Sequence, residues 1–214
     1  IWTASGDLDS DDMLSGTMIT FSPSTALTSG RISASWEGII TDETGTITVT
    51  GGAQSYLKIR DQSGGNGNEV GDVTMTTDES LTMYAAVYDG DNNYLEDINV
   101  NWITTGTLEN VSSFGNSFTF NPSVAFLSGT VSIASGSLSG DATGTITVTG
   151  GAQSYLKIRD ASGGGGNEVD AVTMTTDESL AMYAAVYDED DNYLEDVNVN
   201  WITTGTLEYV SSFG

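Results

Sequence analysis

Apolar and polar residues alternate along most of the chain with a period of two. Leu81, Met83, Ala85 and Val87 occupy every second position of one short segment. Successive side chains of a β-strand point to opposite faces, so this spacing predicts strands with one buried face. The same alternation recurs at Leu57/Ile59, Ile98/Val100/Trp102, Phe118/Phe120, Val131/Ile133 and Ile146/Val148. No stretch shows a sustained helical period.

Turn-forming residues separate these apolar segments. Gly51-Gly52, the glycine-rich stretch 63–68, the acidic stretch 89–93 and Asn121-Pro122 combine glycine, proline, aspartate and asparagine. These residues favour turns through positive φ, a fixed φ or side-chain bonds to the backbone. About seven short strands in roughly 100 residues, with a tryptophan on the third strand, are typical of an immunoglobulin-like β-sandwich.

A long repeat divides the chain. The segment GTITVTGGAQSYLKIRD occurs at residues 45–61 and again at 144–160, an offset of 99 residues. The segment that begins at Trp2 likewise aligns with those that begin at Trp102 and Trp201. We therefore predict an all-β chain of tandem immunoglobulin-like β-sandwich domains. Residues 1–50 would be the C-terminal half of one repeat, 51–149 a complete repeat, and 150–214 the N-terminal part of a third.

Composition narrows the classes of partner. Thirty acidic residues against five basic ones give a net charge of −25 over 214 residues. This charge repels nucleic acid and anionic lipid headgroups, so we expect neither as a partner. No apolar run approaches the roughly 20 residues that span a bilayer, and we expect no membrane insertion in this part of the protein. The charge fits either a soluble exposed surface or the binding of divalent cations.

Catalytic residues are scarce. The chain contains no histidine and no cysteine, which removes the commonest general base and the thiol nucleophile. A pair of carboxylates could hydrolyse glycosides, but the carboxylates recur in the turns of every copy. An active site in every repeat would be unusual, so we predict that the protein is not an enzyme.

The acidic turn after the second predicted strand is the best candidate for chemistry. Oxygen ligands at alternate positions of a tight loop suit calcium, which takes six to eight oxygens in a flexible geometry. The alternative is a turn in which aspartate and asparagine bond their own backbone. The candidate calcium ligands in the two copies are Asp89, Asp91, Asn93, Asp97, Asp188, Asp190, Asn192 and Asp196.

The order of the strands places these turns at the junctions between repeats. Asp72, Asp78 and Glu79 are predicted to approach Asp188 and its neighbours across a hinge at residues 150–151. Carboxylates gathered in this way repel each other unless a cation lies between them. Calcium is therefore expected to stiffen the junctions.

Two further features carry alternatives. The glycine-rich insertion from Asp61 to Asp72 is either a flexible loop or a bulge where a strand changes sheet, or else a second metal site. Trp102 is expected in the core, because it alternates in phase with Ile98 and Val100. Trp36 stands where the next copy has Ser135, so either it is exposed and contributes to a contact surface or the local packing differs.

The turn and core residues together resemble the bacterial Ig-like repeat of the invasin and intimin type. The resemblance lies in SLTMYAAVYDGDNNYLEDINVNWITTGTLENVSS (80–113) and FTFNPSVAFLSGTVSIASGSLSGDATGTITVTGG (118–151). It implies an immunoglobulin-like fold and an extracellular or cell-surface location. It implies little about function, because the matching positions belong to core and turns. They are Tyr88-Asp89, Asn93, Trp102, Gly106-Thr-Leu108, Gly129 and Thr145-Ile-Thr-Val148.

Three functions remain open. The leading hypothesis is a structural spacer in a surface stalk such as that of an adhesin, whose partners are the neighbouring repeats. The alternative is a subunit of a self-assembling extracellular filament, in which the incomplete end units are completed by strand exchange with other copies. A third hypothesis is a binding module whose loops recognise a carbohydrate or a host protein.

Overall fold

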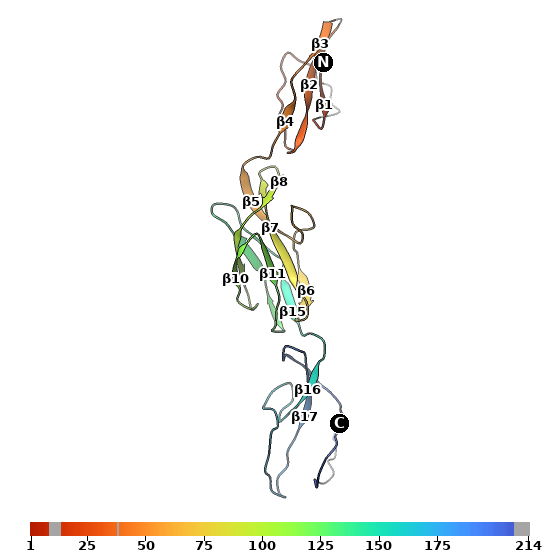
Figure 1. The fold of residues 1–214 in the computed structure, drawn as a ribbon, viewed down its shortest axis with the longest axis vertical. Helices are drawn as coiled ribbons and strands as arrows, with labels where there is room; N and C mark the ends of the chain where they lie inside the picture. The colour runs from red at the N-terminus through yellow and green to blue at the C-terminus, as the bar shows by residue number, and fades with distance from the viewer. Residues whose placement is uncertain (9–13, 38, 208–214) are drawn as a thin grey trace.

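The chain forms an elongated molecule of three units stacked along one axis (Figure 1). The computed structural model describes residues 1–8, 14–37 and 39–207. Over these residues the regular structure consists of strands, and no helix is present. The all-β prediction is therefore confirmed for the described part of the chain. Within the same residues, no helix is long and apolar enough to cross a membrane.

The middle unit is a sandwich of two layers. In the first layer, β7 (Leu81–Asp89) lies between β5 (Gln54–Arg60) and β11 (Ser117–Phe120), and all pairings are antiparallel. The short strand β8 (Tyr94–Asp97) folds back onto β7 after the acidic turn. This layer therefore ends in the turn that carries the candidate calcium ligands.

The second layer combines two small sheets. One has the order β10 (Ser112–Gly115), β9 (Val100–Thr104), β13 (Val131–Ala134) and β14 (Asp141–Ala142). The other has the order β12 (Leu127–Gly129), β15 (Ile146–Thr149) and β6 (Val73–Thr76). Only Thr130 separates β12 from β13 along the chain, so the two sheets continue one another. The β6–β15 pair is parallel, unlike the other strand pairs of the unit.

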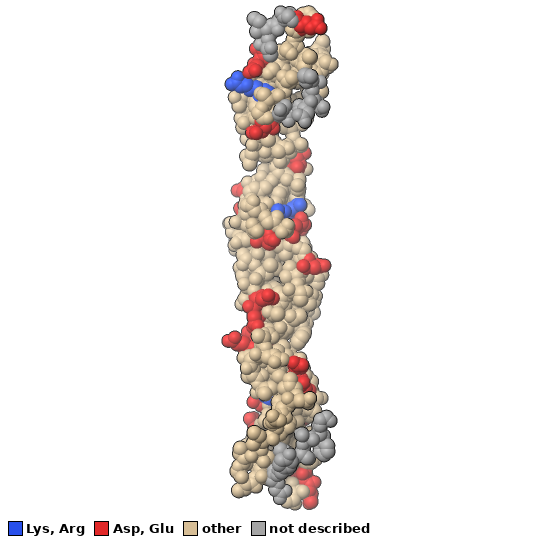
Figure 2. All heavy atoms as spheres, turned by 90° about the vertical axis from the view of Figure 1, so that its right-hand side faces the viewer, with Lys and Arg blue, Asp and Glu red and all other residues tan. Residues whose placement is uncertain are grey.

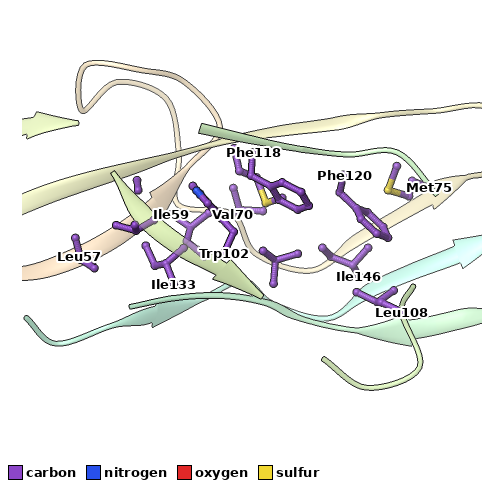
Figure 3. Packing of buried hydrophobic residues seen from close by; sticks show 14 of the residues in the cluster. Leu57, Ile59, Val70, Met75, Trp102, Leu108, Phe118, Phe120, Ile133 and Ile146 are labelled. Carbon is purple, nitrogen blue, oxygen red and sulfur yellow. The ribbon is translucent and has the colours of Figure 1, made fainter. Parts of the chain in front are cut away.

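The core lies between these layers (Figure 3). Trp102 is completely buried, its ring lies 5.8 Å from that of Phe118, and its Nε1 donates a 2.9 Å hydrogen bond to the Gly115 carbonyl. The prediction that this tryptophan belongs to the core is confirmed. Leu81 and Ile98 are partly buried and pack against this core. The other alternating positions are buried with Trp102: Leu57, Ile59, Met83, Ala85, Val87, Val100, Phe118, Phe120, Val131, Ile133, Ile146 and Val148.

Each end unit contains one layer of this sandwich. The first has β1 (Trp2–Gly6), β2 (Thr28–Trp36), β3 (Ile39–Glu43) and β4 (Ile47–Val49), which correspond to the second layer. The third has β16 (Tyr155–Arg159), β17 (Tyr183–Tyr187) and β18 (Tyr193–Asp196), which correspond to the first layer.

The missing layers leave apolar side chains uncovered. Leu156 is 55% exposed, whereas its counterpart Leu57 in the middle unit is 2% exposed. Met174 is 46% exposed, whereas Met75 is 4% exposed. The end units therefore lack the closed core of the middle unit.

Candidate functional site at the junctions between units

The acidic turn of the middle unit is organised around Asp89. This side chain is buried, and its Oδ1 accepts the backbone N–H groups of Asp91 at 3.0 Å and Asn93 at 2.8 Å. Its Oδ2 accepts the N–H of Gly52 at 2.9 Å. The Asn93 amide also donates to both oxygens, at 3.2 and 3.0 Å. The turn interpretation, in which the aspartate bonds its own backbone, is confirmed.

Asn93 connects this turn to the preceding unit. Its Oδ1 accepts the N–H of Ala26 at 3.0 Å, and its Nδ2 donates to the Ser24 carbonyl at 2.9 Å. Ser24 and Ala26 precede β2 of the first unit. The Asn93 amide is thus held by Asp89 on one side and grips the neighbouring backbone on the other. We refer to such a pair as an Asp–Asn clasp: Asp89 with Asn93, and Asp188 with Asn192.

The second clasp repeats this geometry. Asp188 is fully buried and accepts the N–H of Gly151 at 3.0 Å and that of Asn192 at 2.8 Å. Asn192 accepts the N–H of Ala125 at 3.0 Å and donates to the Ser123 carbonyl at 3.0 Å. The bonds between neighbouring units are therefore the same at the two junctions.

The second junction has additional bonds from the end of β6. Thr77 Oγ1 donates to Asp188 Oδ2 at 3.0 Å, and Asp78 Oδ2 accepts the N–H of Ala152 at 2.6 Å. Residues 1–50 contain no copy of this segment, which explains why the first junction lacks these bonds.

The glycines at the junctions permit close packing. A Cβ on Gly51 would lie 2.2 Å from Leu95 Cδ2, and one on Gly150 would lie 2.2 Å from Leu194 Cδ2. A Cβ on Gly151 would come within 2.6 Å of Asp78 Oδ1. The predicted hinge at residues 150–151 is therefore a packed, hydrogen-bonded linker.

Backbone strain is also concentrated here. Among the described residues, the non-glycine positions with positive φ are Leu27 (60°), Asn92 (68°), Phe126 (62°) and Asp191 (68°). All four lie in the segments that form the two junctions. Bulky residues such as Leu27 and Phe126 rarely adopt this conformation, and it persists only where the surrounding structure imposes it. The junction geometry is thus strongly determined.

The remaining predicted calcium ligands point elsewhere. Asp91 and Asp190 are exposed. Asp97 Oδ2 accepts the N–H of Gly64 at 2.8 Å, and Asp196 Oδ2 accepts that of Gly163 at 2.7 Å, both in the glycine-rich loop. Within the part of the chain that the structure describes, no three acidic side chains converge as they would around a metal ion. Calcium binding by these turns stays a prediction.

The expected meeting of carboxylates across the second junction is only partly found. Asp78 lies at the junction, but Asp72 Oδ1 accepts the N–H of Thr145 at 2.7 Å, at the opposite end of the β6–β15 pair. Glu79 Oε2 accepts the N–H of Thr76 at 2.8 Å within its own turn. Hydrogen bonds to N–H groups therefore offset the charge that was expected to need a cation.

These bonds set the acidity of the clasp carboxylates. The N–H groups of Gly52 and Asn93 lower the pKa of Asp89 from 3.8 to about 2, because they stabilise its ionised form. Burial raises the pKa of Asp188, but bonds from Gly151, Asn192 and Thr77 outweigh burial, and its pKa is lowered overall. Both clasps therefore hold a charged carboxylate at neutral pH.

An aromatic cluster beside each clasp was not foreseen. The rings of Tyr56 and Tyr88 stack at 5.7 Å, and Tyr94 meets Tyr88 edge to face at 5.9 Å. Lys58 Nζ lies 5.6 Å from the Tyr88 ring and 3.2 Å from Glu69 Oε2. The identical letters Tyr-Leu-Lys-Ile-Arg in both copies were the available signal. This cluster braces the outer face of the layer that carries the acidic turn.

The glycine-rich insertion is an ordered loop built around Arg60. The guanidinium donates to the carbonyl groups of Gly65, Asn66 and Gly67 at 3.1, 3.2 and 2.6 Å. The loop joins β5 in one layer to β6 in the other. The expected change of sheet after the first strand is confirmed, and the alternative of a second metal site in this loop stays a prediction.

Trp36 is 74% exposed at the end of β2, so of the two alternatives for this residue the structure favours exposure. The chain as a whole matches no protein-family model, no curated protein and no solved structure.

Proposed function

We propose that this chain is a structural spacer, a run of tandem immunoglobulin-like domains in an extracellular or cell-surface stalk. The observation that carries the proposal is the recurrence of the Asp–Asn clasp at both junctions with the same partners and nearly the same distances. A repeated rigid joint places successive units in one line, which is what a spacer requires.

The topology of the middle unit supports the immunoglobulin-like assignment. Its two layers, the buried Trp102 on β9 and the first strand divided between the layers all fit that architecture. The surface supports an exposed location. Figure 2 shows acidic side chains along the whole length of the face in view, and such charge keeps an extended surface soluble and apart from like surfaces.

Small-angle X-ray scattering tests the spacer proposal. The double variant Asn93→Ala/Asn192→Ala removes the side chains that grip the preceding units, so the maximum dimension should fall and the scattering should become that of a jointed chain. The control Asn101→Ala/Asn200→Ala changes two exposed asparagines away from the junctions and should leave the profile unchanged. A wild-type chain that already scatters as flexible beads would contradict the proposal.

A second candidate, the filament subunit, is favoured by the complementary end units. The first unit has the layer that the third lacks, and the reverse also holds. In the middle unit, Asp141 Oδ2 accepts a 2.7 Å hydrogen bond from the backbone N–H of Ile59, which lies on the first strand, β5. Asp42 is the counterpart of Asp141, and Ile158 is the counterpart of Ile59. By the same geometry, Asp42 of one copy would accept the backbone N–H of Ile158 of another.

Light scattering after size exclusion distinguishes the two functions. The measurement uses the chain of 214 residues. Strand exchange predicts oligomers that grow with concentration, and Asp42→Ala should weaken them. A monomer at every concentration supports the spacer without exchange.

A further inference from the structure

We propose that the parallel β6–β15 pair is a mechanical clamp, through which each complete unit resists tension along the molecule. This inference rests on the proposed spacer function, because a spacer that holds a distal part away from a surface is pulled at its ends. The feature that points to the clamp is the direction of these two strands relative to the points where the chain enters and leaves the unit.

The path of the chain determines how the load acts. The chain enters the middle unit at β5, beside the first unit, and leaves it after β15, beside the third (Figure 1). Tension therefore pulls β15 forward through its own C-terminal end, and pulls β6 backward once β5 has separated from β7. Because β6 and β15 are parallel neighbours, they are pulled in opposite directions along their length. Their hydrogen bonds are then sheared together instead of being opened one after another.

The contacts of this pair extend beyond the four-residue ladder that joins Val73–Thr76 to Ile146–Thr149. At one end, Val73 N donates to the Thr145 carbonyl at 2.9 Å and Thr145 N donates to Asp72 Oδ1 at 2.7 Å. At the other end, Thr77 N donates to the Thr149 carbonyl at 3.2 Å. A carboxylate acceptor gives a stronger bond than a carbonyl, so Asp72 reinforces the end where β6 is pulled.

The core protects these bonds from water. Ile146 and Val148 are completely buried and Met75 is 4% exposed, so one face of the pair is closed by apolar side chains. Water can replace a hydrogen bond only where it reaches the broken groups, and a bond in a dry environment is stronger. The clamp should therefore hold until it fails in a single event.

Direction-dependent pulling tests the clamp. The chain contains no cysteine, so introduced cysteines are unique attachment points. Gly71→Cys with Ala152→Cys loads β6 and β15 at opposite ends and shears the pair. Gly71→Cys with Thr145→Cys loads them at the same end and peels it. Gly71 has open space around it, and Thr145 and Ala152 are exposed, so these changes are compatible with the fold.

The expected result in single-molecule force spectroscopy is a rupture force at least twofold higher in the shearing geometry. In that geometry Asp72→Ala should lower the force, whereas Glu96→Ala, which removes an exposed carboxylate outside both strands, should not. Equal forces in the two directions would overturn the clamp. Circular dichroism must show that all variants are folded.

A failure of the clamp can be distinguished from a failure of the spacer. Scattering that shows a straight molecule together with equal rupture forces rejects the clamp alone. Scattering that shows a freely jointed chain rejects the spacer, whatever the forces are.

Discussion

At the scale of single residues, the junctions depend on an uncommon use of aspartate. Asp89 is buried with its charge, a state that is costly unless hydrogen bonds compensate for the lost water. Both of its oxygens accept N–H groups, and four of the five bonds come from within the turn that it organises, from Asp91 and Asn93. Asn93, oriented by these bonds, then bridges the two units. The carboxylate is thus a positioning group for the amide.

This arrangement predicts a pH dependence. The pKa of Asp89 in the folded protein, about 2, lies below its ordinary value of 3.8. A depressed pKa contributes stability that is present above about pH 4 and is lost as the pH falls toward 2. The pKa of Asp188 is shifted in the same direction. Acid should therefore weaken both clasps as the pH falls below about 4.

The variant Asp89→Asn/Asp188→Asn isolates this effect. It should melt at a lower temperature than the wild type at pH 7, because an amide cannot accept all the N–H groups that face a carboxylate. The gap between the two melting temperatures should narrow from about pH 4 to about pH 2. The other carboxylates titrate alike in both proteins, so a gap that stays constant with pH would show that the clasp aspartates do not contribute.

At the scale of elements, the glycine-rich loop shows how one side chain can order a long connection. Twelve residues from Asp61 to Asp72 carry the first strand from one layer to the other, and Arg60 binds three of their carbonyl groups. The planar fork of the guanidinium supplies several donors in fixed directions, which a lysine cannot reproduce. The loop therefore depends on the shape of Arg60 as well as on its charge.

Arg60→Ala should lower the free energy of unfolding by about 1–3 kcal/mol, the usual cost of losing a hydrogen-bonded charged group. Arg60→Lys should restore little of this loss. Hydrogen exchange should accelerate at the loop, and denaturant unfolding gives the energy. The matched control is Arg31→Ala, whose exposed guanidinium makes one ion pair at 3.4 Å and should matter little. If Arg60→Lys were as stable as the wild type, the geometric role would be refuted.

Much of the element structure could be predicted from alternation, because strand burial depends on neighbours two residues apart. The core positions on β5, β7, β9 and β11 follow directly from this pattern. The parallel β6–β15 pairing could not be predicted in this way, because it joins segments 73 residues apart and depends on where the first strand changes layer. The hydrogen bonds from Arg60 to the loop carbonyl groups could not be predicted either, because they produce no periodic pattern in the sequence.

The position of the acidic turns at the junctions could be predicted from the sequence, whereas most of their contacts could not. The turn chemistry of Asp89 is local and visible in the sequence, as Asp-x-Asp-x-Asn. The partner of Asn93 is a backbone segment of another unit, and its position depends on how the units stack. The direction of Asp97 toward the glycine-rich loop likewise requires the fold of that loop. The spacing along the chain therefore placed Asp97 in one ligand group with Asp89 and Asn93, whereas in the structure Asp97 binds a different loop.

At the scale of the whole molecule, the remaining question is what holds the units in line. The clasps account for the alignment, because they are hydrogen bonds between groups of the chain itself. The glycines of the linkers pack closely against neighbouring side chains, so the linkers are not open hinges. A calcium ion would have to compete with the N–H groups that already occupy the oxygens of Asp89 and Asp188. The side chains of Asp91 and Asp190 are exposed to solvent. Salt screens their attraction for a cation there, so they are expected to bind one weakly.

If the hydrogen bonds of the clasps alone hold the junctions, calcium acts on this molecule only as a screening ion, in contrast to the predicted stiffening by bound calcium. After chelation, millimolar calcium should change the maximum scattering dimension and the melting temperature no more than millimolar magnesium does, because both screen the net charge of −25 alike. Asp91→Asn/Asp190→Asn should respond to calcium as the wild type does. A lengthening or a rise in melting temperature that calcium alone produces, and that this double variant loses, would contradict this expectation. It would show that the turn carboxylates bind the ion and that the metal contributes to the stiffness of the junctions.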